Sequence, residues 1–145
     1  MTNSETQPLI IERQDRLLII TFNRPDTLNA FNTVLTQTMH DRLAEVSGDQ
    51  SIGAILFKGN GRSFSAGADL KESPEDHERT EDLLQRVLEL LRPIDKVVVA
   101  AVQGHCYVGA FKLIACCDLV VATETTKIKA QVRGPREGPD WPTFI

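Results

Sequence analysis

The sequence predicts an α/β fold, in which strands and helices alternate along the chain and pack in layers. Short β-rich runs recur, and stretches with apolar residues at helical spacing lie between them. The 145 residues are the length of a single domain and are enough to bury a core.

The first elements read as a hairpin followed by a helix. Residues 8–14, PLIIERQ, and 17–23, LLIITFN, are β-rich runs on either side of a polar link, Gln14-Asp15-Arg16. The segment NRPD, residues 23–26, breaks the second strand. Asn32 is a good N-cap for a helix, whose apolar positions are Val34, Leu35, Met39, Leu43 and Val46.

Further elements follow the same alternation. Residues 53–59, GAILFKG, predict a short buried strand closed by a glycine-rich turn, and SPEDHERTED, residues 73–82, predicts a charged loop. The run Glu72, Glu75, Asp76 and Glu78 is therefore expected to be solvated. A second apolar helix face follows and ends near Arg92-Pro93; it consists of Leu83, Leu84, Val87, Leu88 and Leu91. VVVAAV, residues 97–102, predicts a strand, a helix is expected from about Gly109, and DLVVAT, residues 118–123, predicts another strand.

Composition excludes several classes of partner. The net charge of −4 and the lack of a basic stripe argue against nucleic acid. No signal-peptide pattern and no membrane-length apolar run is visible, so a cytoplasmic protein is expected. Cys106, Cys116 and Cys117 are odd in number and form no CxxC pair, which indicates reduced, packed thiols. His40 and His77 have no metal-ligand spacing, so no metal site is expected.

Two glycine turns follow predicted strands. One is RSFSAGADL, residues 62–70, and the other begins GHCYVGAFK at residue 104. If helical turns begin near Ala68 and Gly109, their first amides lack acceptors and lie at the positive end of a helix dipole. Two such amides would form an oxyanion hole for a carbonyl oxygen. The alternative is that both are only strand-to-helix turns. His105, Cys106 and Tyr107 in the second turn are either packing residues or near a substrate.

Three segments together resemble the crotonase superfamily, the enoyl-CoA hydratase/isomerase family. They are NRPDTLNAFN from Asn23, FSAGADLKE from Phe64, and VVVAAVQGHCYVGA with the following ACCDLVVATE up to Glu124. The resemblance covers roughly Leu9 to Lys129. It implies a spiral of ββα turns, an acyl-CoA thioester substrate, and no separate cofactor, since coenzyme A is part of the substrate. Fatty-acid or acyl-CoA metabolism is the context it implies.

The resemblance also assigns roles to residues. It implies that the amides of Ala68 and Gly109 form the oxyanion hole, and that the backbone near Ala66 meets the adenine. The other implied substrate contacts are Asp26, Thr27 and Leu28 beside the pantetheine and phosphates, Gly67, Asp69 and Leu70, and Lys71 as a phosphate contact.

The sequence departs from the family at the glutamates that catalyse hydration. The first glutamate position holds Lys112, and the second falls near Val132 in an irregular, divergent tail, residues 131–145. We therefore expect a partial acyl-CoA-binding core over residues 1–130. It would be an incomplete spiral without the C-terminal helical region, and a homo-oligomer, if one forms, would lack the family's trimer contacts.

Lysine does not replace glutamate chemically. A protonated ammonium can help to stabilise an enolate but cannot act as the base that takes a proton from water. Two hypotheses stay open: an enzyme that uses the oxyanion hole, and a catalytically inactive or truncated binding or interaction module. Alternatively, Lys112 is only a solvated lysine. A serine hydrolase is disfavoured because GRSFS lacks the final glycine of GxSxG.

Overall fold

The computed structural model describes residues 7–130 and confirms the alternation of strands and helices. The elements in chain order are β1 (Leu9–Gln14), β2 (Leu17–Phe22), the 3-10 helix η1 (Pro25–Thr27), α1 (Thr33–Ser47), β3 (Ala54–Gly59), α2 (Pro74–Leu91), β4 (Val97–Val102), β5 (His105–Tyr107), α3 (Gly109–Ala115), β6 (Leu119–Ala122) and β7 (Lys127–Lys129). Asn32 caps α1 as expected, because its side chain accepts a hydrogen bond from the Leu35 amide at 2.9 Å.

Five strands form the main sheet, in the order β1-β2-β3-β4-β6. β1 and β2 are the expected antiparallel hairpin, and β2, β3, β4 and β6 run parallel. The two short strands β5 and β7 pair parallel in a second sheet. The sequence reading missed both, because a three-residue strand is too short to show a period.

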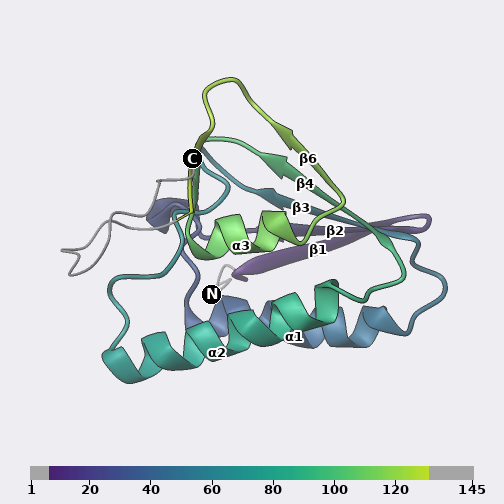
Figure 1. The fold of residues 1–145 in the computed structure, drawn as a ribbon, viewed down its shortest axis with the longest axis horizontal. Coiled ribbons are helices and arrows are strands. Elements are labelled where there is room, and N and C mark those ends of the chain that lie inside the picture. The colour runs from purple at the N-terminus through teal and green to yellow at the C-terminus, as the bar shows by residue number, and fades with distance from the viewer. Residues whose placement is uncertain (1–6, 131–145) are drawn as a thin grey trace, which may run out of the picture.

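The core lies between one face of the main sheet and the helices. Figure 1 shows α1 and α2 side by side across that face, with α3 closer to the strands. The Phe22 ring makes edge contacts with Phe31 and Phe64, at centroid distances of 5.2 and 5.1 Å, and stacks on Phe57 at 6.2 Å. Phe31 follows the loop between β2 and α1, and Phe64 precedes the glycine turn at Gly67, so this cluster fixes both loops of the candidate site to the sheet.

The predicted loop at residues 73–82 is wrong, because α2 already begins at Pro74. Ser73 caps it through its hydroxyl, which accepts from the Asp76 amide, and proline occupies the first turn. Glu72, expected to be solvated, instead accepts from the amide and the hydroxyl of Thr33 and from the Thr80 hydroxyl, each at 2.8 Å. The first turns of α2 are polar and exposed, so they resemble a loop in composition, although their capping signals are those of a helix.

The helical turn expected near Ala68 is wrong. No helix begins there, and Ala68 instead forms an isolated parallel bridge with Phe31. The divergent tail and Val132 lie outside the described residues. No helix in residues 7–130 has both the length and the apolar character that crossing a bilayer requires.

Candidate active site

The two glycine turns lie side by side in the structure. Ser65 and Cys106 form a parallel bridge, in which the Ser65 amide donates to the His105 carbonyl at 3.0 Å and the Tyr107 amide donates to the Ser65 carbonyl at 3.1 Å. Gly67 sits against Tyr107: a Cβ there would lie 2.8 Å from the Tyr107 carbonyl oxygen, and its φ is +91°. Only glycine meets both conditions, so Gly67 allows this approach.

A third segment completes the arrangement. The Phe31 amide donates to the Gly67 carbonyl at 2.7 Å, and the Asp69 amide donates to the Phe31 carbonyl at 3.1 Å. The Ala66 amide donates to the Leu28 carbonyl at 2.9 Å. The structure therefore brings the predicted residues near 28, 66–69 and 109 together. Asp26 and Thr27 lie in η1 next to them.

Two backbone amides of this junction are open. Among residues 7–130, the N–H groups of Ala68 and Gly109 donate to no acceptor. Gly109 is the first residue of α3, where an N–H has no intrahelical partner, and it is buried. The amides are thus available to an oxygen acceptor.

Val108, the residue before α3, has an unusual backbone conformation. Its φ of 48° and ψ of −95° lie in a region that a β-branched residue rarely adopts. Its amide donates to the Lys129 carbonyl at 2.6 Å, which ties the turn to β7. Strain of this kind persists where surrounding contacts over-determine the backbone, and it is concentrated at functional sites.

Lys112 follows Gly109 by one turn of α3 and points toward α2. Its Nζ lies 3.7 Å from Oε2 of Glu81, and both side chains are well exposed, at 48% and 38%. An exposed ion pair at this distance contributes little stability. The ammonium of Lys112 is therefore paired with a carboxylate from α2.

The loop after Ala68 is held by an ion pair that the sequence did not predict. Arg24 Nη2 contacts Asp69 Oδ2 at 3.0 Å, and Arg24 Nη1 donates to the Ala30 carbonyl at 2.6 Å. Burial alone would raise the pKa of the Asp69 carboxyl, but the Lys71 amide and the Arg24 guanidinium together hold that pKa below its usual value. Of the predicted contacts here, Leu70 is 95% exposed and Lys71 is exposed.

Asn29 and Ser63 also position the loops, and neither was predicted. Buried Asn29, with φ of 56°, donates through Nδ2 to the carbonyls of Asn60 and Ser63, each at 2.8 Å. Ser63 Oγ lies 2.9 Å from His105 Nδ1. The His105 ring contacts the Tyr107 ring edge-on at 4.9 Å, and Lys129 Nζ lies 4.8 Å from the centre of the Tyr107 ring. Asparagine tolerates positive φ, which was the available sequence signal at position 29.

The thiols of Cys106 and Cys117 are not poised for nucleophilic chemistry. Burial raises the pKa of Cys106 to about 12, and burial with nearby Cys116 and Asp118 raises that of Cys117 to about 12. This agrees with the expected packing role, and the three cysteines are free. Within residues 7–130 no group of three or more His, Cys, Asp or Glu is arranged to hold a metal ion.

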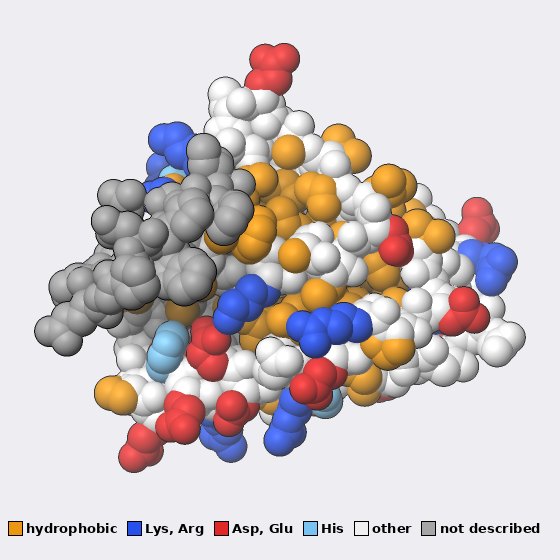
Figure 2. Space-filling view, viewed as in Figure 1, with side chains coloured by type: hydrophobic (Ala, Val, Ile, Leu, Met, Phe, Trp, Pro, Cys, Tyr) orange, Lys and Arg blue, Asp and Glu red, His pale blue; other side chains and the backbone are white. Residues whose placement is uncertain are grey.

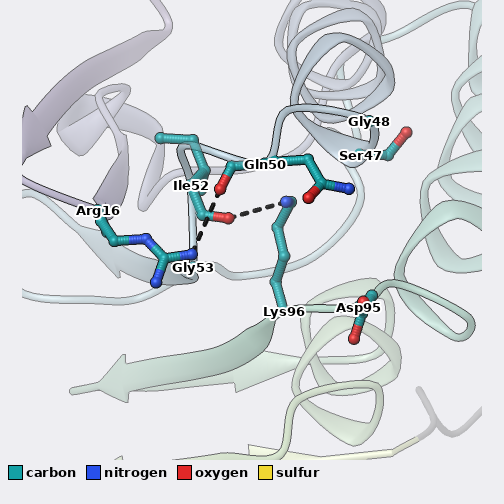
Figure 3. Close-up of a pocket in the computed structure, with 8 residues that line it drawn as sticks. All are labelled: Arg16, Ser47, Gly48, Gln50, Ile52, Gly53, Asp95 and Lys96. Atoms are coloured by element: carbon teal, nitrogen blue, oxygen red, sulfur yellow. Dashed lines mark hydrogen bonds between the residues drawn. The ribbon is translucent and has the colours of Figure 1, made fainter.

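A polar cavity lies elsewhere, where α1 leads into β3 (Figure 3). Its lining includes Arg16, Gln50, Ile52 and Lys96. Lys96 Nζ donates to the Ile52 carbonyl at 2.9 Å, and Arg16 Nη2 donates to the Gln50 carbonyl at 3.3 Å. Both cations thus hold the connection between α1 and β3, and the cavity is separate from the glycine turns.

Comparisons with known proteins agree with this arrangement. A model of the family "Enoyl-CoA hydratase/isomerase" matches residues 12–133. The chain is 37% identical over 121 residues to the 2,3-dehydroadipyl-CoA hydratase of Escherichia coli, covering 82% of this chain and 48% of that protein. It is 31% identical over 124 residues to the crotonyl-CoA hydratase of Syntrophomonas wolfei, again covering 82% and 48%.

Solved structures give the same result. An enoyl-CoA hydratase/isomerase from Marinobacter aquaeolei matches with a TM-score of 0.76 and 30% identity, over 84% of this chain and 51% of that chain. Pseudomonas aeruginosa AtuE matches with a TM-score of 0.79 and 26% identity, over 84% and 50%. The chain spans about half the length of the curated relatives it matches. By family match, sequence identity and fold, the chain belongs to the enoyl-CoA hydratase/isomerase family.

Proposed function

We propose that the chain binds an acyl-CoA thioester at the junction of the glycine turns, with the amides of Ala68 and Gly109 directed at the thioester oxygen. The observation that carries this proposal is that these two N–H groups have no acceptor among residues 7–130, although the segments around them are pinned by backbone hydrogen bonds. Such donors stabilise the negative charge of an enolate, and losing one typically costs about 2.7–4 kcal/mol of barrier.

The other predicted contacts belong to the same proposal. The Ala66 carbonyl accepts no hydrogen bond from residues 7–130, which leaves it open to an adenine amino group. Lys71 is exposed and is the proposed phosphate contact. Asp69 is committed to Arg24, so we propose that it acts by holding the loop. We place the protein in the cytoplasm, in acyl-CoA metabolism.

Lys112 determines which chemistry we propose. Lys112 lies one helical turn after Gly109 and pairs with Glu81, and its ammonium supplies no base for water. We therefore propose that this site stabilises an enolate without the glutamate-based hydration of the family. Reactions that need only the enolate, such as decarboxylation or enolate trapping, fit it.

The second candidate is a binding module without catalysis. The observation that favours it is the Lys112–Glu81 pair, in which the ammonium is already partly neutralised and exposed to solvent. This candidate shares the acyl-CoA site with the first. The two differ in whether a bound thioester that carries a carboxylate on its α-carbon, such as malonyl-CoA, loses carbon dioxide, because this route to the enolate needs no base.

Binding calorimetry with two ligands tests the site. One is acetoacetyl-CoA, which has a thioester carbonyl, and the other is a CoA thioether that lacks it. We expect the thioester to bind at least tenfold more tightly than the thioether. Gly67→Ala should bring the ratio of the two affinities close to one, because a Cβ there collides with the Tyr107 carbonyl and moves the Ala68 amide.

Gly48→Ala is the matched control. A Cβ at Gly48 meets nothing within 4 Å, and the backbone φ there is −96°. This variant should keep the preference for the thioester. Equal binding of both ligands by the unmodified chain would show that no oxyanion hole operates.

A further inference from the structure

The polar cavity of Figure 3 lies at the edge of the main sheet opposite the glycine turns, and its volume is about 270 Å³. Gly53 and Lys96 of its lining precede β3 and β4, whereas the glycine turns follow the ends of these strands. Because β3 and β4 are parallel, their beginnings and their ends lie at opposite edges. At the right of Figure 1 the β1–β2 turn meets the segments before β3 and β4, and Figure 2 shows charged side chains of both signs there.

The two cations that line this cavity have unused hydrogen-bond donors. An ammonium has three N–H donors, and that of Lys96 uses two within residues 7–130, on the carbonyls of Asp49 at 2.7 Å and Ile52 at 2.9 Å. A guanidinium has five donors, and that of Arg16 uses one in the same range, on the Gln50 carbonyl. The contacts with the loop therefore position both cations without saturating them.

Neither cation is neutralised by a carboxylate. Arg16 and Lys96 form no ion pair within residues 7–130, and neither does Asp95, which also lines the cavity. The Asp49 carboxylate accepts instead from the amide and the hydroxyl of Ser51, at 2.9 and 2.6 Å. The lining therefore carries two positive charges and one negative charge, in a protein whose net charge is −4.

The backbone of the lining adds further donors. In the part of the chain that the structure describes, the N–H groups of Gln50, Asp95 and Lys96 have no acceptor. The Arg16 guanidinium packs on Gly53, where a Cβ would lie 3.2 Å from its Cζ atom, so glycine leaves room for it. Arginine, lysine and free backbone amides together are the donors that proteins use to bind phosphate oxygens.

We propose that this cavity binds a phosphate group between the Arg16 guanidinium and the Lys96 ammonium. A phosphate ester carries about 1.5 to 2 negative charges at pH 7, which would offset the excess positive charge of the lining. A water molecule takes about 30 Å³ of liquid volume, so the cavity has room for a phosphate with a small organic group. Free phosphate and a small phosphate monoester present the same chemistry to the two cations.

An NMR titration of the protein with inorganic phosphate tests this proposal. At constant ionic strength, the backbone amide signals of Gln50, Asp95 and Lys96 should shift together and saturate at millimolar phosphate. Glycerol 3-phosphate is the second ligand. Equal affinity for the two would identify the free ion as the ligand, and tighter binding of the ester would identify a phosphate monoester.

Two isosteric substitutions change the charge of the cavity and remove no side-chain hydrogen bond within residues 7–130. Gln50→Glu should weaken phosphate binding about fivefold and Asp95→Asn should strengthen it about fivefold, the effect of a unit charge a few ångströms away in a solvent-exposed site. Gln85→Glu and Asp82→Asn are the matched controls. Both positions are exposed on α2 and outside the lining, so the same changes in net charge should leave the affinity unaltered there.

The proposal thus predicts an order of affinity for phosphate: Asp95→Asn binds most tightly, then the unmodified chain, then Gln50→Glu. Equal affinities of the unmodified chain and all four variants would overturn it. Shifts that grow linearly without saturation would do the same, because they indicate screening and not a site. Saturating shifts confined to residues outside the lining would also overturn it, since phosphate would then bind elsewhere.

Discussion

Lys112 is the residue at which the resemblance to the family implies a glutamate. The sequence predicted that it lies one helical turn after Gly109, and α3 begins at Gly109 as predicted. The sequence did not indicate that Lys112 pairs with Glu81. The two residues lie 31 positions apart, on α3 and α2, so no local pattern connects them.

Replacing Lys112 by Glu should not produce a hydratase. The unmodified chain is expected to show no measurable hydration of crotonyl-CoA. Lys112→Glu alone should show none either, because it restores only one of the two glutamates that the resemblance implies, and each such group is worth about 10²–10⁴-fold. A spectrophotometric assay of crotonyl-CoA decides this. Turnover by the unmodified chain at a thousandth of a typical hydratase rate would contradict it.

The same substitution should affect stability through Glu81. Two carboxylates would then face each other, and we expect a loss of about 0.2–1 kcal/mol in the free energy of unfolding, as for exposed charge pairs. The charge-swapped double variant, Lys112→Glu with Glu81→Lys, should recover it. Urea denaturation of the unmodified chain, of the single variants Lys112→Glu and Glu81→Lys, and of the double variant measures this coupling directly.

At Val108, glycine and alanine substitutions should have the reverse of their usual order of stability. Alanine is normally more stable than glycine in ordered backbone by about 0.5–1 kcal/mol. At Val108, with φ of 48°, glycine avoids the strain of about 1–3 kcal/mol that a side chain imposes. We therefore expect Val108→Gly to be more stable than Val108→Ala in urea denaturation. A Val108→Ala variant more stable than Val108→Gly would show that the Val108 backbone is not strained in solution.

At the scale of elements, the sequence predicted α1, α2 from Leu83 onward, α3, and five strands close to where they lie. Their apolar positions have a clear period, and the capping Asn32 marks the start of α1. The polar start of α2 was missed because only its later turns face the core. The contacts that hold the site were not predictable: the Arg24–Asp69 and Thr33–Glu72 pairs join residues 45 and 39 positions apart.

The Arg24–Asp69 pair connects the loop after Ala68 to the loop before α1, and its contribution should depend on pH. The folded-state pKa of Asp69 is below its unfolded value, so the stabilisation is complete above about pH 4 and is lost as pH falls through the lower folded-state pKa. We expect Asp69→Asn to cost about 1.5–3 kcal/mol at pH 7 and progressively less below pH 4.

Asp82 is the control for that measurement. It is exposed on α2 and its side chain makes no hydrogen bond or ion pair within residues 7–130, so Asp82→Asn should leave the stability of the protein nearly unchanged at every pH. Thermal unfolding at a series of pH values compares the two variants. A constant difference between Asp69→Asn and the unmodified protein from pH 7 to pH 2 would contradict the assignment.

At the scale of the whole molecule, β6 should make the chain prone to associate, because its four apolar residues, 119–122, are all exposed and its outer edge has no partner strand among residues 7–130. We expect its apparent mass in light scattering to rise with concentration, because exposed apolar edges pair with one another. Val121→Lys should reduce this association, and Val34→Lys should not. A monomer at all concentrations would show that β6 is covered in solution.

The contacts of Ser63 indicate when the site forms during folding. Its carbonyl accepts from Asn29, 34 residues earlier, and its hydroxyl contacts His105, 42 residues later. Closing each loop costs about 3 kcal/mol of chain entropy before any contact offsets it. The binding site should therefore form late and only in the globally folded chain. An acyl-CoA that binds there would then stabilise the folded state. The melting temperature should rise with the logarithm of the acyl-CoA concentration.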